Sequence, residues 1–243
     1  MSIPEFGSDT LNDLTPDPTE KRRVVVLISG NGSNLQALID AQSHDRLSGE
    51  IVAVISNEPG AYGLKRAHEA GIDAVALPHR EYDSREAYDS ALITVIERHE
   101  PDLIVLSGFM RILSPHFVER YEGRMLNIHP SLLPAYQGLN THARALADGI
   151  TEHGCSVHFV TEELDGGPVA IQAVVNVEAG ESEESLTEKV HAREHLILPI
   201  AVNWFLEGRL QFAGDSATID GMTLPRHGMR LSHQDAAEEL DET

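Results

Sequence analysis

The sequence lacks several features that would assign it to a membrane or a secretory pathway. It holds one cysteine, Cys155, so no disulfide can form within the chain, and we expect a reducing, cytoplasmic location. No apolar run is long enough to span a bilayer, and the start has no signal-peptide pattern. We therefore expect no membrane partner.

Basic residues, and lysine above all, are also scarce. The chain carries 39 acidic and 18 basic residues, a net charge of -21, and its only lysines are Lys21, Lys65 and Lys189. Because affinity for nucleic acid comes mainly from Lys and Arg on phosphates, we expect no nucleic-acid partner. Residues 21–210 alone hold 27 acidic and 16 basic residues, a net charge of -11. An acidic surface of no specific function is one interpretation; the lysine shortage favours halophilic adaptation to high salt.

Apolar, β-branched runs alternate with helical patterns through the first half of the chain. We expect strands at 24–29, 51–57, 73–77, 103–107 and 125–129. A helix should start near residue 33, a second lies near 62–70, and a third is capped by Ser84 and runs to about 99. This order predicts an α/β fold with an open, mostly parallel, Rossmann-like sheet and right-handed crossovers.

The pattern changes after residue 129. A helix at 141–148 precedes two strands at 155–160 and 169–177, which we expect to form an antiparallel C-terminal extension of the sheet. A long helix at 185–206 should kink or break at Pro199. The expected division is a disordered leader at 1–21, one domain at 22–212, and at 213–243 a short hairpin around Asp220-Gly221 followed by an acidic tail.

A glycine-rich loop, Gly30-Asn31-Gly32-Ser33-Asn34, stands where the first strand meets a helix. Its glycines permit a tight turn, and free N–H groups at the helix start can bind an anion. A dinucleotide fingerprint would need a glycine at Leu35, and the Lys-Ser/Thr of a triphosphate loop is missing. A single phosphate monoester fits best. The alternative is a tight turn with Ser33 as helix N-cap.

A polar pair ends the strand at 125–129. Successive strand residues point to opposite faces, so Asn127 and His129 share one face while Leu126 and Ile128 can pack into the core. Pro130 keeps His129 extended. The alternative is a core strand whose polar pair is satisfied by hydrogen bonds.

Asp165-Gly166-Gly167 closes a loop after another strand, where glycines would let a carboxylate approach a neighbouring element. A solvent-exposed turn is the commoner use of Asp-Gly. His142 and His158 are further candidates, although a lone histidine is more often structural. Without HExxH or clustered Cys and His we expect no metal site, and without GxSxG no serine nucleophile.

Four motifs in order carry a resemblance to a known family. They are GNGSN at 30–34, SGFMRILSP at 107–115, NIHPSLLP at 127–134 and HFVTEELDGGP at 158–168. Over residues 22–212 the chain resembles the glycinamide ribonucleotide formyltransferases, folate-dependent enzymes of purine synthesis. The resemblance implies 10-formyltetrahydrofolate as co-substrate, small-molecule partners only, and a cytoplasmic monomer or homodimer.

The resemblance also assigns site residues. Asn127, His129 and Asp165 match the family's catalytic trio, and Glu194 matches a carboxylate that receives the glycinamide end of the substrate. The residues matching the phosphate site are Asn31, Gly32, Ser33 and Asn34. The residues matching the folate pocket are Arg85, Met110, Arg111, Ile112, Leu113 and Val160 to Asp165, including Leu164.

One departure from the family pattern falls in the loop after Pro134. Where bacterial relatives read Pro-Gly-Leu-His-Thr-His, this chain has Gln137-Gly-Leu-Asn140-Thr-His142. The missing proline and histidine affect the stiffness of the loop and its contact with substrate, and leave the trio intact.

The trio suits direct transfer without a covalent intermediate. Asn127 and a protonated His129 would stabilise the oxyanion formed when an amine attacks the formyl carbon, and Asp165 would assist proton transfer. Methionyl-tRNA formyltransferase and formyltetrahydrofolate deformylase have the same trio. We disfavour both, because only a short acidic segment follows residue 212 and a short leader precedes the first strand. A non-catalytic nucleotide-binding module would keep the phosphate loop but would not need the trio.

Overall fold

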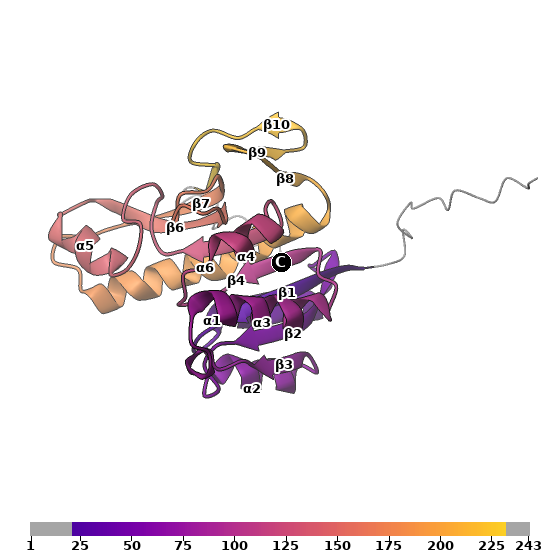
Figure 1. The fold of residues 1–243 in the computed structure, drawn as a ribbon. Coiled ribbons are helices and arrows are strands. Elements are labelled where there is room, and N and C mark those ends of the chain that lie inside the picture. The colour runs from indigo at the N-terminus through magenta and orange to yellow at the C-terminus, as the bar shows by residue number, and fades with distance from the viewer. Residues whose placement is uncertain (1–20, 232–243) are drawn as a thin grey trace, which may run out of the picture.

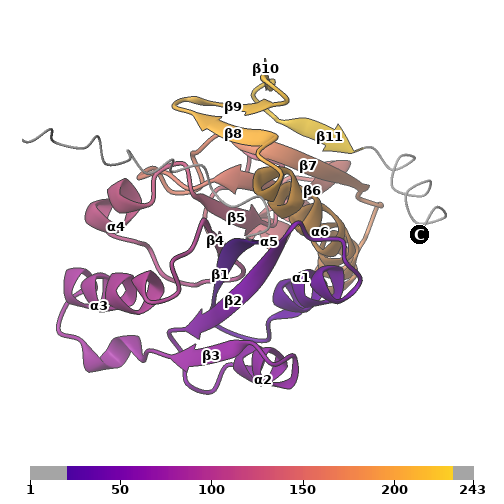
Figure 2. The same cartoon turned by 90° about the vertical axis from the view of Figure 1, so that its right-hand side faces the viewer.

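The computed structural model describes residues 21–231, in which helices cover both faces of one eight-stranded sheet (Figures 1 and 2). A second sheet of three short strands lies beside the C-terminal end of the long helix (Figure 1). The expected leader, apart from Lys21, and the expected acidic tail after residue 231 lie outside the described residues. Among residues 21–231 no helix is both long and apolar enough to cross a membrane.

The elements follow in chain order. The strands of the main sheet are β1 (Arg22–Ile28), β2 (Gly49–Ser56), β3 (Asp73–Ala76), β4 (Leu103–Leu106), β5 (Met125–His129), β6 (Glu152–Phe159), β7 (Val169–Asn176) and β11 (Met229–Leu231). The helices are α1 (Ser33–Ser43), α2 (Tyr62–Glu69), α3 (Arg85–Glu97), α4 (Pro115–Arg120), α5 (Thr141–Ala147), α6 (Glu183–Leu206) and a 3₁₀ turn, η1 (His79–Glu81). The small sheet consists of β8 (Leu210–Ala213), β9 (Ser216–Ile219) and β10 (Met222–Thr223).

The main sheet has the order β11-β7-β6-β5-β4-β1-β2-β3. Neighbouring strands pair in parallel along β3, β2, β1, β4 and β5, and β6 runs antiparallel to both β5 and β7. The predicted α/β fold, a mostly parallel sheet with an antiparallel extension, is confirmed. The chain leaves β1 toward β2 and later returns to β4 on its other side, so the carboxyl ends of β1 and β4 flank a switch point where ligands bind in such sheets.

The alternation of strand residues divides the core into two layers. Val24 and Val26 of β1 pack with the cluster that includes α1 and α6, whereas Val25 packs with the cluster under α3 and α4. Leu126 and Ile128 of β5 join the α1 and α6 layer, as the sequence predicted. Asn127 and His129 are thereby left at the end of β5 on the opposite face.

The long helix differs from expectation at Pro199. Helix α6 continues from Glu183 to Leu206 with Pro199 inside it, so of the expected kink or break the break does not occur. Leu198 and Ala201, on either side of the proline, are fully buried in the α1 and α6 layer. Packing on this scale outweighs the roughly 3 kcal/mol disadvantage of a proline in a helix.

Several short elements were not predicted. Helix α4 begins at Pro115, with the Ser114 hydroxyl accepting a hydrogen bond from the Phe117 N–H. Strand β8 spans the expected domain boundary at residue 212, and β11 pairs in parallel with β7. The turn between β9 and β10 falls at Asp220 and Gly221, where the sequence predicted a hairpin. The C-terminal segment is therefore partly built into the main sheet.

Candidate active site

His129 ends β5 and lies between a backbone carbonyl and a carboxylate. Its side chain is 7% exposed. The ring Nε2 is 3.0 Å from the Tyr136 carbonyl oxygen, which can only accept, so Nε2 carries a proton and donates. The Nδ1 atom lies 3.5 Å from Asp165 Oδ2. A doubly protonated ring therefore has an acceptor on each side, whereas a neutral ring would turn its Nδ1 lone pair toward a carboxylate.

Asp165 reaches His129 from the connection between β6 and β7. Its backbone is in the left-handed region at φ 50, a conformation that an aspartate tolerates better than most residues. A side chain at Gly167 would collide with the Phe159 carbonyl, which explains the second of the two glycines that follow the aspartate. The Asp165 Oδ2 accepts a hydrogen bond from the Gly138 N–H at 2.9 Å. The loop after β5 and the loop between β6 and β7 thus meet at the Asp165 carboxylate.

His158 stands opposite Asn127 in the pairing of β6 with β5. Its Nδ1 donates to the Phe159 carbonyl at 2.8 Å, so Nε2 is the acceptor and lies 3.0 Å from Asn127 Nδ2. Burial lowers the pKa of His158 to about 4, which keeps the ring neutral. The 3.8 Å approach of its Nε2 to Asp165 Oδ1 is consequently not an ion pair. His158 instead fixes which way the Asn127 amide points.

His142, the other histidine suggested by the sequence, lies apart from this group. Its Nδ1 is 3.1 Å from His153 Nε2, at the start of α5. Burial lowers the pKa of both rings, that of His153 to about 4. The two histidines contact each other. Within residues 21–231, His142 makes no hydrogen bond or ion pair with Asp165.

The glycine-rich loop joins β1 to α1 as predicted, but its cap differs. Gly32, at φ 75, is the N-cap of α1 and Ser33 is the first helical residue, so Ser33 is not the cap. A side chain at Gly32 would meet the Gly63 Cα at 2.8 Å. Gly63 also donates its N–H to the Gly30 carbonyl at 3.1 Å. The loop therefore needs glycine on both sides of this close approach. The first N–H groups of α1 have no hydrogen-bond partner within the helix.

Arg66 of α2 holds this loop from behind and was missed by the sequence analysis. Its Nε donates to the Asn31 carbonyl and one terminal nitrogen donates to Asn31 Oδ1, both at 2.9 Å. The other terminal nitrogen donates to Gln36 Oε1 at 2.9 Å. The guanidinium also stacks over the Tyr62 ring, 4.9 Å from its centroid. A cation is thus fixed beside an amide-rich loop, a pairing suited to an anion.

Glu194, in the middle of α6, lies next to the same loop. Its Oε2 accepts a hydrogen bond from Asn34 Nδ2 at 2.8 Å, and only 4% of the residue is exposed. Burial raises the pKa of Glu194, and the Asn34 hydrogen bond acts against that rise. The structure therefore brings together Asn34 and Glu194, which are 160 residues apart.

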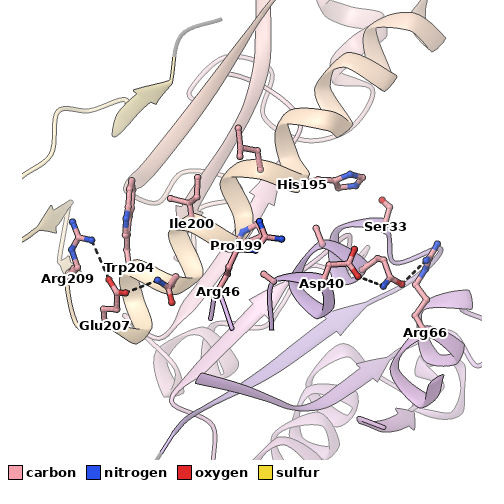
Figure 3. A pocket seen from close by; sticks show the side chains of 15 residues that line it. Ser33, Asp40, Arg46, Arg66, His195, Pro199, Ile200, Trp204, Glu207 and Arg209 are labelled. Carbon is pink, nitrogen blue, oxygen red and sulfur yellow. Dashed lines mark hydrogen bonds and ion pairs between the residues drawn. The ribbon is translucent and has the colours of Figure 1, made fainter. Parts of the chain in front are cut away.

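A groove of about 880 Å³ opens between α1 and α6 on the outer side of the loop (Figure 3). Ser33, Arg66 and His195 lie at one end of it and Trp204 and Arg209 at the other. The loop is thus accessible from the surface along this groove.

A small cavity of about 100 Å³ lies beside Asn127 and Asp165 of the trio. All the predicted folate-pocket residues except two line it, together with Asn127 and His158 and with three apolar residues that were not predicted. The predicted ones are Arg111, Ile112, Leu113 and Val160 to Asp165, and the three apolar residues are Leu106, Phe109 and Val118. Phe109 lies inside the SGFMRILSP motif, so the motif could have predicted that this residue lines the pocket.

Two residues expected in the folate pocket do not line this cavity. Arg85 begins α3 with its Nε 3.6 Å from Glu86 Oε1, and 43% of its side chain is exposed. Met110 is 69% exposed. Their role in binding folate stays a prediction. Among the described residues, no group of three His, Cys, Asp or Glu side chains is placed to hold a metal ion.

Comparison with known proteins gives the family. The profile of a family described as "Formyl transferase" matches residues 22–202. The phosphoribosylglycinamide formyltransferase of Escherichia coli (strain K12) is 56% identical over 205 residues, which cover 84% of this chain and 97% of that protein. The enzyme of the same name from Haemophilus influenzae is 43% identical over 207 residues, covering 85% and 98%.

Solved structures agree with the sequence comparison. A structure of the phosphoribosylglycinamide formyltransferase of Coxiella burnetii matches with a TM-score of 0.84 at 51% identity, covering 87% of this chain and 100% of that one. The residues matched by the family profile include strands β1 to β7 and both loops of the site. The chain belongs to the formyl transferase family.

Proposed function

We propose that this protein transfers the formyl group of 10-formyltetrahydrofolate to the amine of glycinamide ribonucleotide, a step of purine biosynthesis. The observation that carries the proposal is the convergence of Asn127 and His129, on strand β5, with Asp165, on the loop between β6 and β7. Asn127 and Asp165 line the folate-pocket cavity, and the relatives named above are phosphoribosylglycinamide formyltransferases.

The proposed reaction begins when the substrate amine attacks the formyl carbon. A nitrogen–carbon bond forms and the carbonyl electrons move to oxygen, which becomes an oxyanion. The free N–H of Asn127 and the Nδ1–H of a protonated His129 are the donors available to it. The 3.5 Å separation of His129 Nδ1 from Asp165 is longer than a good hydrogen bond, so a closer acceptor can compete for that proton. Such a donor contributes about 3–4 kcal/mol in other enzymes.

Collapse of the oxyanion breaks the bond between the formyl carbon and the folate nitrogen. The attacking nitrogen must lose a proton and the leaving nitrogen must gain one. Asp165 is the carboxylate of the trio, and we assign to it the acceptance and return of this proton, directly or through water. No covalent enzyme intermediate and no metal is part of this scheme.

Substrate binding is assigned to the phosphate loop. The N–H groups of Gly32, Ser33 and Asn34 at the start of α1 would bind the phosphate, with the positive charge of Arg66 close behind Asn31. Glu194 would receive the glycinamide end. A buried carboxyl with a raised pKa can release its proton when a cationic or hydrogen-bonding group arrives.

Folate binding is assigned to the cavity beside the trio. Leu113 and Val160 form its apolar walls, and the exposed Ile112 and Leu164 stand at its rim. The Arg111 guanidinium stacks on the Tyr88 ring, 4.8 Å from its centroid, and its Nε is buried without a hydrogen-bond partner among the described residues. That unpaired donor suits an acceptor on the folate. Arg85 and Met110 are proposed to join when the co-substrate binds.

The setting of the enzyme is part of the same proposal. We assign it to the cytoplasm, as a monomer or homodimer that acts on small molecules alone, because Cys155 is buried as a free thiol and the acidic surface disfavours nucleic acid. The acidity of the folded body and the three lysines support an adaptation to high salt.

An acceptor assay tests the function. Formyl transfer from 10-formyltetrahydrofolate is measured with glycinamide ribonucleotide, with charged methionyl-tRNA, and with water alone as acceptor. The proposal requires transfer to the ribonucleotide to dominate. Dominant transfer to tRNA or water would indicate one of the related activities, and no transfer at all would indicate a nucleotide-binding module.

A further inference from the structure

Three consecutive residues, Tyr136 to Gly138, contact two members of the trio. The Tyr136 carbonyl accepts the His129 Nε2 proton at 3.0 Å, and the Gly138 N–H donates to Asp165 Oδ2 at 2.9 Å. Between them, Gln137 Nε2 donates to the Asp165 backbone carbonyl at 3.1 Å. We call residues 136–138 the brace. It is the one segment of the described chain that hydrogen-bonds both His129 and Asp165.

The backbone on both sides of this contact is in an unfavourable conformation. Tyr136 has φ 55 and Asp165 has φ 50, and non-glycine residues in the left-handed region are strained by about 1–2 kcal/mol. Such conformations persist only where neighbouring contacts hold them. The hydrogen bonds across the brace are contacts of that kind.

A polar cavity of about 550 Å³ lies on one side of the Asp165 turn. It is lined by Gln137 and Asp165 and, from the C-terminal segment, by Asp215 and Arg226. The brace hydrogen bonds from Gln137 and Gly138 hold the turn beside this cavity.

The brace is itself anchored to α5. A terminal nitrogen of Arg144 donates to the Gln137 carbonyl at 2.7 Å, and its guanidinium stacks over the Tyr136 ring, 5.4 Å from the centroid. The Tyr136 hydroxyl donates to Asp148 at 2.9 Å. Helix α5 thus fixes the segment that in turn fixes the two catalytic side chains.

From this geometry we infer that Gln137 is a positioning residue, whose side-chain amide holds the Asp165 turn so that the carboxylate faces His129. The inference rests on the proposed catalytic role of Asp165. It also gives a reason for the departure from the family pattern, because a proline at this position could not donate a hydrogen bond, whereas glutamine spans the gap to the Asp165 carbonyl.

The test replaces Gln137 with methionine, which has similar length and no donor. Gln211→Met is the matched control, since Gln211 Nε2 makes the same kind of bond to the Gly208 carbonyl at 3.0 Å on the exposed C-terminal sheet. The loss of one positioning hydrogen bond should lower kcat about 3- to 10-fold. KM for the ribonucleotide should stay within about twofold, because within residues 21–231 the phosphate loop has no contact with the brace. The control should keep the parent kcat.

A double-mutant cycle separates this inference from the catalytic assignment. If Gln137 acts through Asp165, Gln137→Met should have no further effect on kcat in an Asp165→Ala background. An unchanged kcat for Gln137→Met, an effect on KM alone, or an equal loss in both backgrounds would overturn the positioning role and leave the proposed function standing. Normal turnover of Asp165→Ala itself would refute the catalytic assignment instead, and with it this inference.

Discussion

His158 and Asn127 face each other across the β5–β6 pairing, with Asn127 Nδ2 donating to His158 Nε2 at 3.0 Å. The His158 Nδ1 proton is committed to a backbone carbonyl, so its tautomer is fixed. The amide oxygen and the second amide proton of Asn127 consequently have defined directions. A residue that the family resemblance did not assign therefore sets the geometry of the proposed oxyanion donor.

Replacement of His158 by phenylalanine should lower kcat about tenfold, because the Asn127 amide loses the acceptor that orients it and is free to flip. His158→Gln, which retains an acceptor, should retain more of the activity. Steady-state kinetics with both substrates checks this. Equal turnover of the two variants would mean that the histidine has no orienting role.

Arg66 should matter for the ribonucleotide and not for the folate. Arg66→Met removes the cation and three hydrogen bonds behind the phosphate loop, and we expect KM for the ribonucleotide to rise about tenfold or more. Lys65→Met is the control, since Lys65 is the neighbouring cation and its side chain is 60% exposed. If both substrates are affected equally, the loop is not the phosphate site.

The stability of the protein should fall in mild acid. His153 and His158 are buried, with pKa values lowered to about 4 chiefly by that burial, against about 6.5 in the unfolded chain. Between these values the unfolded chain binds more protons. The stability that the neutral rings provide is complete above pH about 6.5 and is lost as the pH falls toward 4, on the order of 3 kcal/mol for each ring at most.

Urea unfolding at pH 7, 5.5 and 4.5 measures this loss, and His153→Gln should show a shallower pH dependence. Glu194 acts in the opposite direction, because a raised carboxyl pKa gives stability that disappears as pH rises. A free energy of unfolding that is constant across this range, or an unchanged slope in the variant, would show that these rings are not buried as the structure has them.

Salt should stabilise the fold. A net charge of -11 over residues 21–210 repels itself in dilute buffer, and exposed pairs such as Arg209–Asp220 offset little of it. The Debye length falls to about 3 Å at 1 M, so most of this repulsion is then screened. We expect Tm and activity to rise with potassium chloride up to molar concentration. Flat curves from about 0.05 to 3 M would refute the adaptation to high salt.

The sequence was sufficient to predict much of the fold because the strands are strongly apolar and alternate with clear helices. The two-residue period of β5 was enough to place Asn127 and His129 on one face. This period could not predict that Asp165 lies near them, because that contact depends on how the loop between β6 and β7 folds toward the end of β5. The resemblance to a family supplied the assignment of Asp165.

What the sequence could not predict depends on contacts between distant segments. Arg66 is one of several arginines on helices, and nothing local distinguishes it until α2 packs behind the loop. Gln137 was noticed only as a departure, and its hydrogen bond to Asp165 requires the brace conformation. Strand β11 is three residues long, too short for a periodic signal, and forms only because β7 offers a free edge.

The most direct test of the account is the rate of single-turnover formyl transfer by Asp165→Asn. This change keeps the size of the side chain and removes its charge and its capacity to accept a proton. We predict that transfer to glycinamide ribonucleotide slows at least about 100-fold, while the dissociation constant for the folate stays close to that of the parent enzyme. Transfer at a near-parental rate would contradict the proposal that Asn127, His129 and Asp165 form the catalytic site.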